Sequence, residues 1–312
     1  MDRFRAGWWS ALALVAVALG ACGGGNGQDA ATAAGGGGFP TTVAAANGPV
    51  SIAHRPQRIV SLSATATEDL YAAGAGGQVA AVDSYSAYPP QAPRTKLSGY
   101  EPDVEAIAGY RPDLVVVAED TDHVVAQLGK LGVPVLVEPP ASDLSAAYGE
   151  IEGLGEATGH AAGARRTVAS MRRRIAAIVA SVPKPDQPLS VYHELDQTYY
   201  SATSHTFIGQ IYELLGLRNI ADEAKGSGEY PQLSAEYVIS SDPDLIVLAD
   251  TVCCRQSAAT VAARPGWDRI AAVRDGEVVP VDDSVASEWG PRIVLFVRKV
   301  ADAAKALERG SG

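Results

Sequence analysis

One short unit occurs twice in this chain, and the repeat constrains the fold more than any other feature of the sequence. The stretch RPDLVVVAED occupies residues 111–120, and DPDLIVLADT occupies residues 242–251. In each copy a glutamate, Glu105 or Glu236, stands seven residues before the proline. Each copy has the pattern of a short helix, a Pro-Asp corner and a continuous apolar strand. The repeat therefore predicts two similar lobes, each containing one copy of the unit.

The length and the apolar pattern support two α/β lobes. A chain of 312 residues is long enough for two cores, and 47% apolar with 20% charged residues is typical of a folded protein. Runs of Val, Leu and Ile alternate with helical segments in residues 50–142 and again in residues 184–312. Such alternation is typical of parallel sheets covered by helices on both faces. We predict two α/β lobes with parallel central sheets and a ligand cleft between them.

The segment between the predicted lobes, residues 143–183, has the pattern of a long helix. It contains no proline before its last position, and its second half places apolar residues at alternating spacings of three and four. These residues are Val168, Met171, Ile175, Ile178 and Val182. We predict that one long helix joins the lobes, with the glycines between positions 153 and 163 as points where it could bend or break.

The N-terminal residues have the pattern of a secretory signal. Two arginines precede an apolar run of about 16 residues, which is shorter than the ~20 that a membrane-spanning helix needs. The run ends in Leu-Gly-Ala-Cys at Cys22, which resembles the lipobox of bacterial lipoproteins. We therefore predict a signal peptide over residues 1–21, acylation of Cys22 and a flexible Gly/Ala-rich tether over residues 22–49.

Charge and cysteine content limit the classes of function. The net charge of −11 argues against a nucleic-acid partner, because an acidic surface repels phosphate. Apart from Cys22, the only cysteines are the adjacent Cys253 and Cys254, which could form a vicinal disulfide or remain as thiols. No phosphate-binding loop, HExxH zinc motif or GxSxG nucleophile motif is present. We expect a monomer without a cofactor that is not an enzyme, and an extracytoplasmic enzyme is the poorly supported alternative.

Four stretches, in order along the chain, resemble the substrate-binding proteins of ABC importers for iron complexes and cobalamin. They are RPQRIVSLSATATEDLYAAG, SGYEPDVEAIAGYRPDLVVV, YPQLSAEYVISSDPDLIVLAD and RPGWDRIAAVRDGEVVPVDD. The resemblance covers residues 52–307. It implies an extracytoplasmic, lipid-anchored protein that captures a metal chelate between two lobes and delivers it to a permease dimer with its ATPase. By the same resemblance, Glu68 and Glu236 are expected to dock on the permease, one from each lobe.

The cleft is expected to be aromatic. Tyrosines and one tryptophan lie on Gly-, Ser- and Pro-rich loops of both lobes, where they could hold a flat, bulky ligand. The expected ligand-binding residues are Tyr85, Tyr88, Tyr100, Tyr199, Tyr200, Tyr230, Arg255 and Trp289. The loop SYSAYPPQA is similar to the corresponding loop of cobalamin-binding members, and this favours a corrinoid.

Two other cargoes remain open at this point. A ferric siderophore is commonly anionic and could be bound by Arg255, whereas Arg292 is expected to brace the last helix. Haem would need an axial ligand, for which His193 and His205 are the weak candidates. We expect no bare metal site, because the five histidines are spread along the chain rather than clustered.

Overall fold

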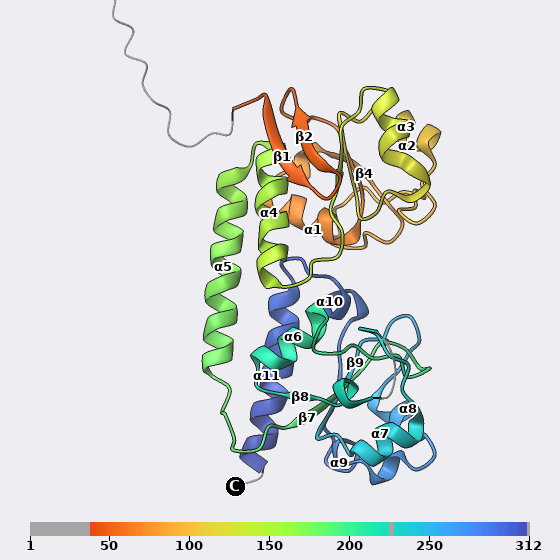
Figure 1. Ribbon diagram of the computed structural model, residues 1–312, viewed down its shortest axis with the longest axis vertical. Coiled ribbons are helices and arrows are strands. Elements are labelled where there is room, and N and C mark those ends of the chain that lie inside the picture. The colour runs from red at the N-terminus through yellow and green to blue at the C-terminus, as the bar shows by residue number, and fades with distance from the viewer. Residues whose placement is uncertain (1–37, 225–227, 311–312) are drawn as a thin grey trace, which may run out of the picture. The chain divides into compact units, whose positions relative to one another are not determined.

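Two four-stranded parallel sheets form the centres of two lobes in the computed structural model, which describes residues 38–224 and 228–310 (Figure 1). The expected signal peptide, Cys22 and residues 22–37 of the expected tether lie outside the described residues. By its internal contacts, Gly35–Gly312 forms one compact unit.

The two sheets have the same topology. The N-terminal sheet has the order β4-β3-β5-β6, and the C-terminal sheet has the matching order β8-β7-β9-β10. Their strands are β3 (Ile59–Leu62), β4 (Val79–Val82), β5 (Leu114–Val117), β6 (Val135–Val137), β7 (Ser190–Glu194), β8 (Arg218–Asn219), β9 (Leu245–Leu248) and β10 (Val278–Pro280). The repeated unit forms β5 and β9, which occupy equivalent positions. The predicted α/β fold with two similar lobes is confirmed.

The strands are apolar on both faces because helices cover both sides of each sheet. All four residues of β5 and all four of β9 are buried. The remaining helices are α1 (Ala64–Ala73), α2 (Val104–Gly109), α3 (Val124–Lys130), α6 (Phe207–Leu214), α7 (Ala235–Ser241), α8 (Ala258–Ala262), α9 (Ala271–Arg274), α10 (Asp283–Ser287) and α11 (Ile293–Gly310), in addition to the two helices of the connecting segment. No described helix combines the length and the apolar character that a membrane span requires.

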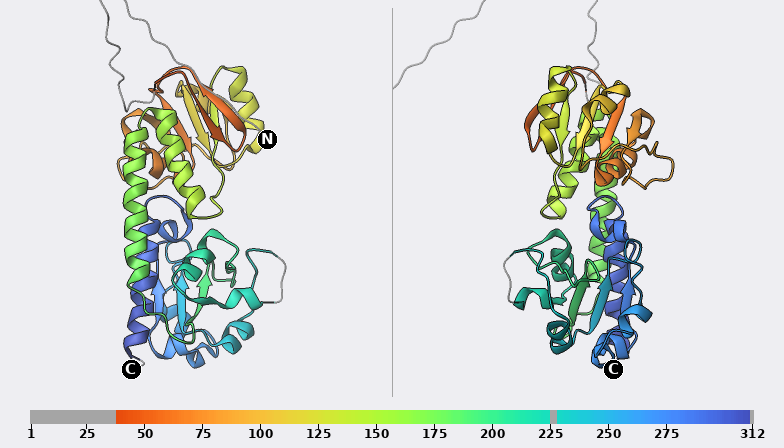
Figure 2. Two further views of the ribbon diagram at one scale, coloured as in Figure 1. Left: turned by 60° about the vertical axis from the view of Figure 1, so that its left-hand side comes forward. Right: turned by 90° about the vertical axis from the view of Figure 1, so that its right-hand side faces the viewer.

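The connecting segment is two helices rather than the single helix expected over residues 143–183. Helix α4 (Leu144–Thr158) ends at Gly159, whose φ of 75° is a left-handed conformation that glycine adopts without strain. Helix α5 (Ala161–Ala180) then runs beside the N-terminal lobe and part of the C-terminal lobe in two differently turned views (Figures 1 and 2). At about 1.5 Å per residue, its 20 residues span about 30 Å. Its four expected apolar positions, Val168 to Ile178, are buried as predicted.

A close contact fixes α5 against the N-terminal lobe. A Cβ atom added to Gly163 would collide with the backbone carbonyl of Ala73, the last residue of α1. One turn later, the Thr167 hydroxyl donates to the Ala72 carbonyl at 2.8 Å. Only glycine at position 163 therefore allows the two helices to approach this closely.

Replacing Gly163 with alanine should destabilise the protein by roughly 1–3 kcal/mol, because the two backbones must separate. The matched control is Gly153→Ala in α4, where an added Cβ atom meets nothing within 4 Å. This control should be neutral or stabilising by up to about 1 kcal/mol, since alanine is the better helix former. Urea unfolding of the two variants measures the difference, and equal effects would contradict the close-packing argument.

A β-hairpin occupies part of the expected tether. Strands β1 (Thr41–Ala45) and β2 (Gly48–Ile52) pair in antiparallel register. The hairpin turn is fixed to the sheet by a hydrogen bond from the Ala46 N–H to the Val137 carbonyl at 3.0 Å. The expectation of a flexible tether as far as residue 49 is therefore wrong for residues 41–49, because alternating burial lets Val43 and Ile52 cover the N-terminal core.

Candidate ligand-binding site

A cavity of about 590 Å³ lies between the lobes at the carboxyl ends of their parallel strands. Ligands of α/β proteins commonly bind at this edge, because the loops that leave the strands are free to vary there. The N-terminal lobe contributes loops that follow β3, β4 and β5, and the C-terminal lobe contributes loops that follow β9 and β10. The predicted cleft between the lobes is present in the structure.

Three of the expected aromatic residues line this cavity: Tyr85, Tyr100 and Trp289. The rings of Tyr85 and Tyr100 meet edge to face with centroids 5.2 Å apart, and these side chains are 60% and 73% exposed. Trp289 enters from the C-terminal lobe, and its indole Nε1–H donates to Oε2 of Glu150 on α4 at 2.7 Å. Aromatic surface with free edges is therefore available from both lobes.

The other expected ligand residues do not line the cavity: Tyr88, Tyr199, Tyr200, Tyr230 and Arg255. The ring of Tyr88 lies under the Arg292 guanidinium at 4.3 Å, and Tyr199 stacks on Trp267 with centroids 5.7 Å apart. Both rings therefore support the protein's own structure. Tyr200, Tyr230 and Arg255 are exposed on loops of the C-terminal lobe, outside the cavity lining.

Neither candidate histidine lies at the cavity. His193 is completely buried on β7, its Nδ1 is 2.5 Å from the Tyr212 hydroxyl, and burial lowers its pKa to about 3. His205 is exposed but does not line the cavity. Among residues 38–224 and 228–310, no group of three or more His, Cys, Asp or Glu side chains is placed to hold a metal ion.

The cavity is strongly acidic, which sequence analysis missed. Five carboxylic side chains line it, and its described lining contains no Lys, Arg or His: the acids are Asp83, Glu119, Asp282, Asp283 and Glu288. Burial acts to raise the pKa of Asp283, but hydrogen bonds from the Cys253 and Val252 N–H groups outweigh it and lower that pKa. The Asp283 carboxylate therefore stays ionised at neutral pH, and the cavity disfavours anions.

Glu68 is not the exposed docking residue that the resemblance implied. It is 3% exposed, and its Oε1 accepts from Arg292 Nε at 2.6 Å, which joins α1 to the start of α11. The N-cap of α1 is Ser63, so Glu68 falls in the second turn of this helix. The expected structural role of Arg292 is confirmed, and Glu68 is its partner.

The contact between Glu68 and Arg292 is called the lobe junction here. More carboxyl groups surround it than the single guanidinium of Arg292 can neutralise. Burial raises the pKa of Glu138 to about 8 and that of Glu150 to about 7. Burial together with the neighbouring Glu68 raises the pKa of Glu288 to about 9. Burial and nearby acids also raise the pKa of Asp69 well above its usual value. The junction therefore holds protons at neutral pH.

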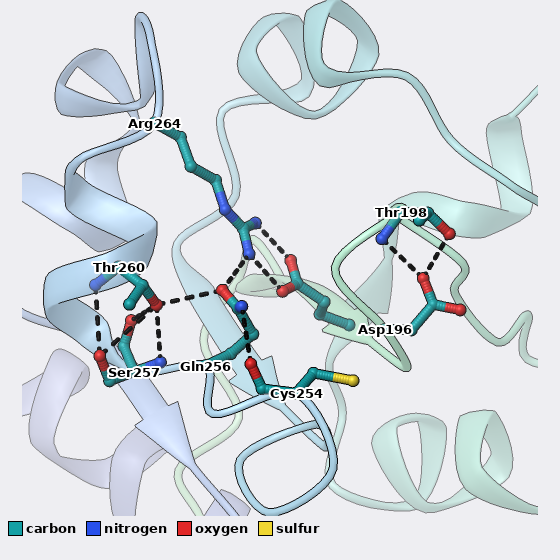
Figure 3. Close-up of polar contacts among 8 residues, drawn as sticks. Asp196, Thr198, Cys254, Gln256, Ser257, Thr260 and Arg264 are labelled. Carbon is teal, nitrogen blue, oxygen red and sulfur yellow. Dashed lines mark hydrogen bonds and ion pairs between the residues drawn. The ribbon is translucent and has the colours of Figure 1, made fainter.

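A second buried ion pair supports the cysteine loop at the cavity (Figure 3). Arg264 donates two hydrogen bonds to Glu194, the last residue of β7, both at 2.6 Å. Arg264 also donates to Gln256 at 2.8 Å, and the Gln256 amide donates to the Cys254 carbonyl at 3.2 Å. Both cysteines are free thiols, and Cys253 lines the cavity. Of the two alternatives that the sequence left open, a vicinal disulfide or two thiols, the structure has the two thiols.

Two exposed glutamates occupy equivalent positions in the lobes. Glu105 lies in the first turn of α2 and Glu236 lies in the first turn of α7, directly before the Pro-Asp corner of each repeat. Each helix is capped by an acceptor side chain, Asp103 or Ser234. A helix N-terminus stabilises a nearby carboxylate, so both charges are held on rigid supports.

Comparisons with known proteins agree with this architecture. Residues 59–285 match the family described as periplasmic binding protein, and the chain belongs to that family. It is 32% identical over 310 residues to the uncharacterized ABC transporter substrate-binding lipoprotein YvrC of Bacillus subtilis, covering 96% of both chains. It is 34% identical over 276 residues to a cobalamin-binding protein of Halobacterium salinarum, covering 85% of this chain and 74% of that protein.

A solved structure gives the same picture. The periplasmic heme-binding protein RhuT of Roseiflexus sp. RS-1 superposes with a TM-score of 0.70 at 25% identity, over 80% of this chain and 98% of that one. With the cleft and the two lobes, these findings define the chain as a substrate-binding protein of the ABC transporter class.

Proposed function

We propose that this protein captures a corrinoid in the cavity between its lobes and delivers it to an ABC permease. The observation that carries the proposal is the lining of the cavity, which combines aromatic rings with five acids and no basic residue. A corrinoid presents a flat macrocycle edged with neutral amides. The macrocycle can stack on tyrosine rings, and the amide N–H groups can donate hydrogen bonds to carboxylates. Cobalamin is neutral overall and cobinamide is cationic, so neither is repelled.

The same lining weighs against the other cargoes. Anionic ferric siderophores and the two propionates of haem would face the carboxylates without a compensating cation, because Arg255 lies outside the cavity. The name of the Halobacterium salinarum relative, cobalamin-binding protein, points to the same cargo. A cavity of about 590 Å³ would hold one face of so large a ligand and leave the rest at the mouth.

Isothermal titration of the chain from Gly35 onward tests this proposal. Cyanocobalamin and dicyanocobinamide should bind at one-to-one stoichiometry. A ferric hydroxamate, a ferric tricarboxylate and haemin should bind at least about tenfold more weakly, which corresponds to ~1.4 kcal/mol. Tighter binding of haemin or of a ferric chelate would overturn the corrinoid assignment, while the class of the protein would stand.

We also propose that Glu105 and Glu236 make the contacts with the permease. They replace the expected pair of Glu68 and Glu236, because Glu68 is buried. The support is positional: both residues are exposed, both begin a short helix, and both belong to the internal repeat, so they match the two halves of a permease dimer.

Substituting Glu105 and Glu236 together with glutamine should lower ligand uptake at least about tenfold in proteoliposomes that contain the permease and its ATPase, since both docking charges are removed. Ligand affinity in titration should stay within about twofold of wild type, because neither residue lines the cavity. Glu213→Gln and Glu229→Gln together are the matched control at exposed positions outside the repeat. Uptake that falls equally in the control pair would reject the docking assignment.

Anchoring through Cys22 remains part of the proposal. Its support is the pattern of the first 22 residues and the description of the Bacillus subtilis relative as a lipoprotein. Labelled palmitate should be incorporated into the wild-type protein in its host, and Cys22→Ser should abolish that incorporation. Equal labelling of both proteins would exclude Cys22 as the acylated residue.

A further inference from the structure

The helix that joins the lobes carries an unusual concentration of positive charge. Five arginines lie on α5, and this helix contains no acidic residue: they are Arg165, Arg166, Arg172, Arg173 and Arg174. All five are exposed, and within the described part of the chain none of them forms an ion pair with a carboxylate. Arg166 and Arg173 lie opposite the buried stripe of α5, and Arg165, Arg172 and Arg174 flank that stripe.

Helix α11 extends this basic surface. The two helices lie side by side in both figures, and near their ends Lys305 Nζ lies 3.4 Å from Ser181 Oγ (Figures 1 and 2). Leu295 of α11 and Arg174 of α5 line the same surface groove. Arg298 and Lys299 are exposed three and four positions after Leu295, which places them on the same face of α11. We call these seven residues, five on α5 and two on α11, the basic helical face.

This face contrasts with the rest of the chain. The whole protein has a net charge of −11, so the remainder is more acidic still. A surface of this kind orients the molecule in an electric field, with the basic helical face turned toward an anionic partner. Figure 1 shows α5 on the side of the molecule opposite α2 and α7, which carry the exposed Glu105 and Glu236.

The point at which the chain enters the fold favours a lipid surface as the anionic partner. The ring of Phe39 and the side chain of Arg55 lie against Gly159, directly before α5 begins. The described chain therefore begins at the N-terminal end of the basic helical face. A membrane that holds an acylated Cys22 would lie within reach of these arginines.

We propose that the basic helical face rests on a bilayer of anionic lipids when the protein is not docked on the permease. Arginines near an anionic leaflet are attracted to it additively, and the acidic remainder of the protein is repelled. In this orientation the helices with Glu105 and Glu236 point away from the membrane, so resting and docking exclude each other. This inference goes beyond the proposed function, and it does not depend on the identity of the cargo.

Sedimentation with vesicles tests the inference. The chain from Gly35 onward should bind vesicles of about 30% phosphatidylglycerol in phosphatidylcholine at low salt, and binding should weaken as salt is added. Arg165→Gln, Arg166→Gln and Arg173→Gln together should lower the affinity about tenfold or more, with an unchanged melting temperature. Arg172 is left in place because its guanidinium stacks on Tyr148 at 4.5 Å.

The matched control removes the same charge elsewhere. Arg94→Gln, Lys96→Gln and Lys130→Gln together change exposed residues of the N-terminal lobe away from α5 and should lower the affinity about threefold or less. No binding to the anionic vesicles, or equal losses in the two triple variants, would overturn the proposal. Tighter binding of single-stranded RNA than of the vesicles would also overturn it, because the face would then fit a different class of partner.

Discussion

Replacing Arg292 with methionine should destabilise the protein by about 3–5 kcal/mol at pH 8, since removing one partner leaves a buried charge uncompensated. Arg292 is the cation that joins the lobes: it contacts Glu68 on α1 and Glu288 at 3.2 Å, and it covers the ring of Tyr88. Glu68 is 3% exposed, so water cannot replace the lost guanidinium. Urea unfolding of the wild type and the variant measures the loss.

A double variant separates the ion pair from simple packing. Arg292→Met combined with Glu68→Gln removes both charges, and it should recover at least ~1.5 kcal/mol of the loss, because a neutral pair costs little to bury. If the effects of the two single changes simply add, the pair is not the reason for the destabilisation. The same outcome would contradict the inference that the ion pair between Glu68 and Arg292 stabilises the lobe junction.

Stability should fall as the pH rises from 5 to 9, which is the second large effect. The pKa values of Glu150, Glu138 and Glu288 are raised to about 7, 8 and 9 in the folded protein, above the ordinary value of 4.5. Above pH 4.5 the unfolded chain loses these protons while the folded protein keeps them. The stabilisation is therefore complete below pH 4.5 and is lost progressively as the pH rises through the folded pKa values.

The size of this loss follows from the distance between the folded and unfolded pKa values. A tenfold change in one acid dissociation constant corresponds to about 1.4 kcal/mol, and three coupled, partly hydrated groups should together remove roughly 3 kcal/mol or more between pH 5 and 9. Unfolding by urea at closely spaced pH values gives the curve. Glu150→Gln should flatten this curve, because glutamine does not titrate. Its amide oxygen can still accept the hydrogen bond from Trp289, so the local structure is kept. Glu156→Gln, at an exposed position on the same helix, should leave the slope unchanged.

The repeat predicted the lobes because it is a local pattern with a local cause. Helix, corner and buried strand are each specified within about ten residues, and the two copies form equivalent strands, β5 and β9. The break between α4 and α5 was anticipated only as one possibility, a bend or a break at any of several glycines. Its cause is one left-handed glycine, Gly159, and a helical pattern on both sides conceals it.

The candidate site was harder to predict because it depends on packing between distant segments. Nothing near Glu68 in the sequence reveals that Arg292, 224 positions later, covers it. The repeat itself contains Glu105, the exposed glutamate that we propose for docking, but the sequence interpretation followed the resemblance instead. Acids such as Asp282 and Asp283 look like ordinary loop residues until the fold brings them to one cavity. The net charge of −11 similarly concealed the arginines of α5.

The central claim is that the ligand occupies the cavity between the lobes. Titration of cyanocobalamin into two tyrosine variants tests this claim most directly. Tyr85→Ala removes an exposed ring from the cavity, whereas Tyr230→Ala removes a similarly exposed ring that does not line it. The account predicts one-to-one binding by the wild type, about tenfold weaker binding by Tyr85→Ala, and an unchanged affinity for Tyr230→Ala. Absence of binding by the wild type, or a loss in Tyr230→Ala alone, would contradict it.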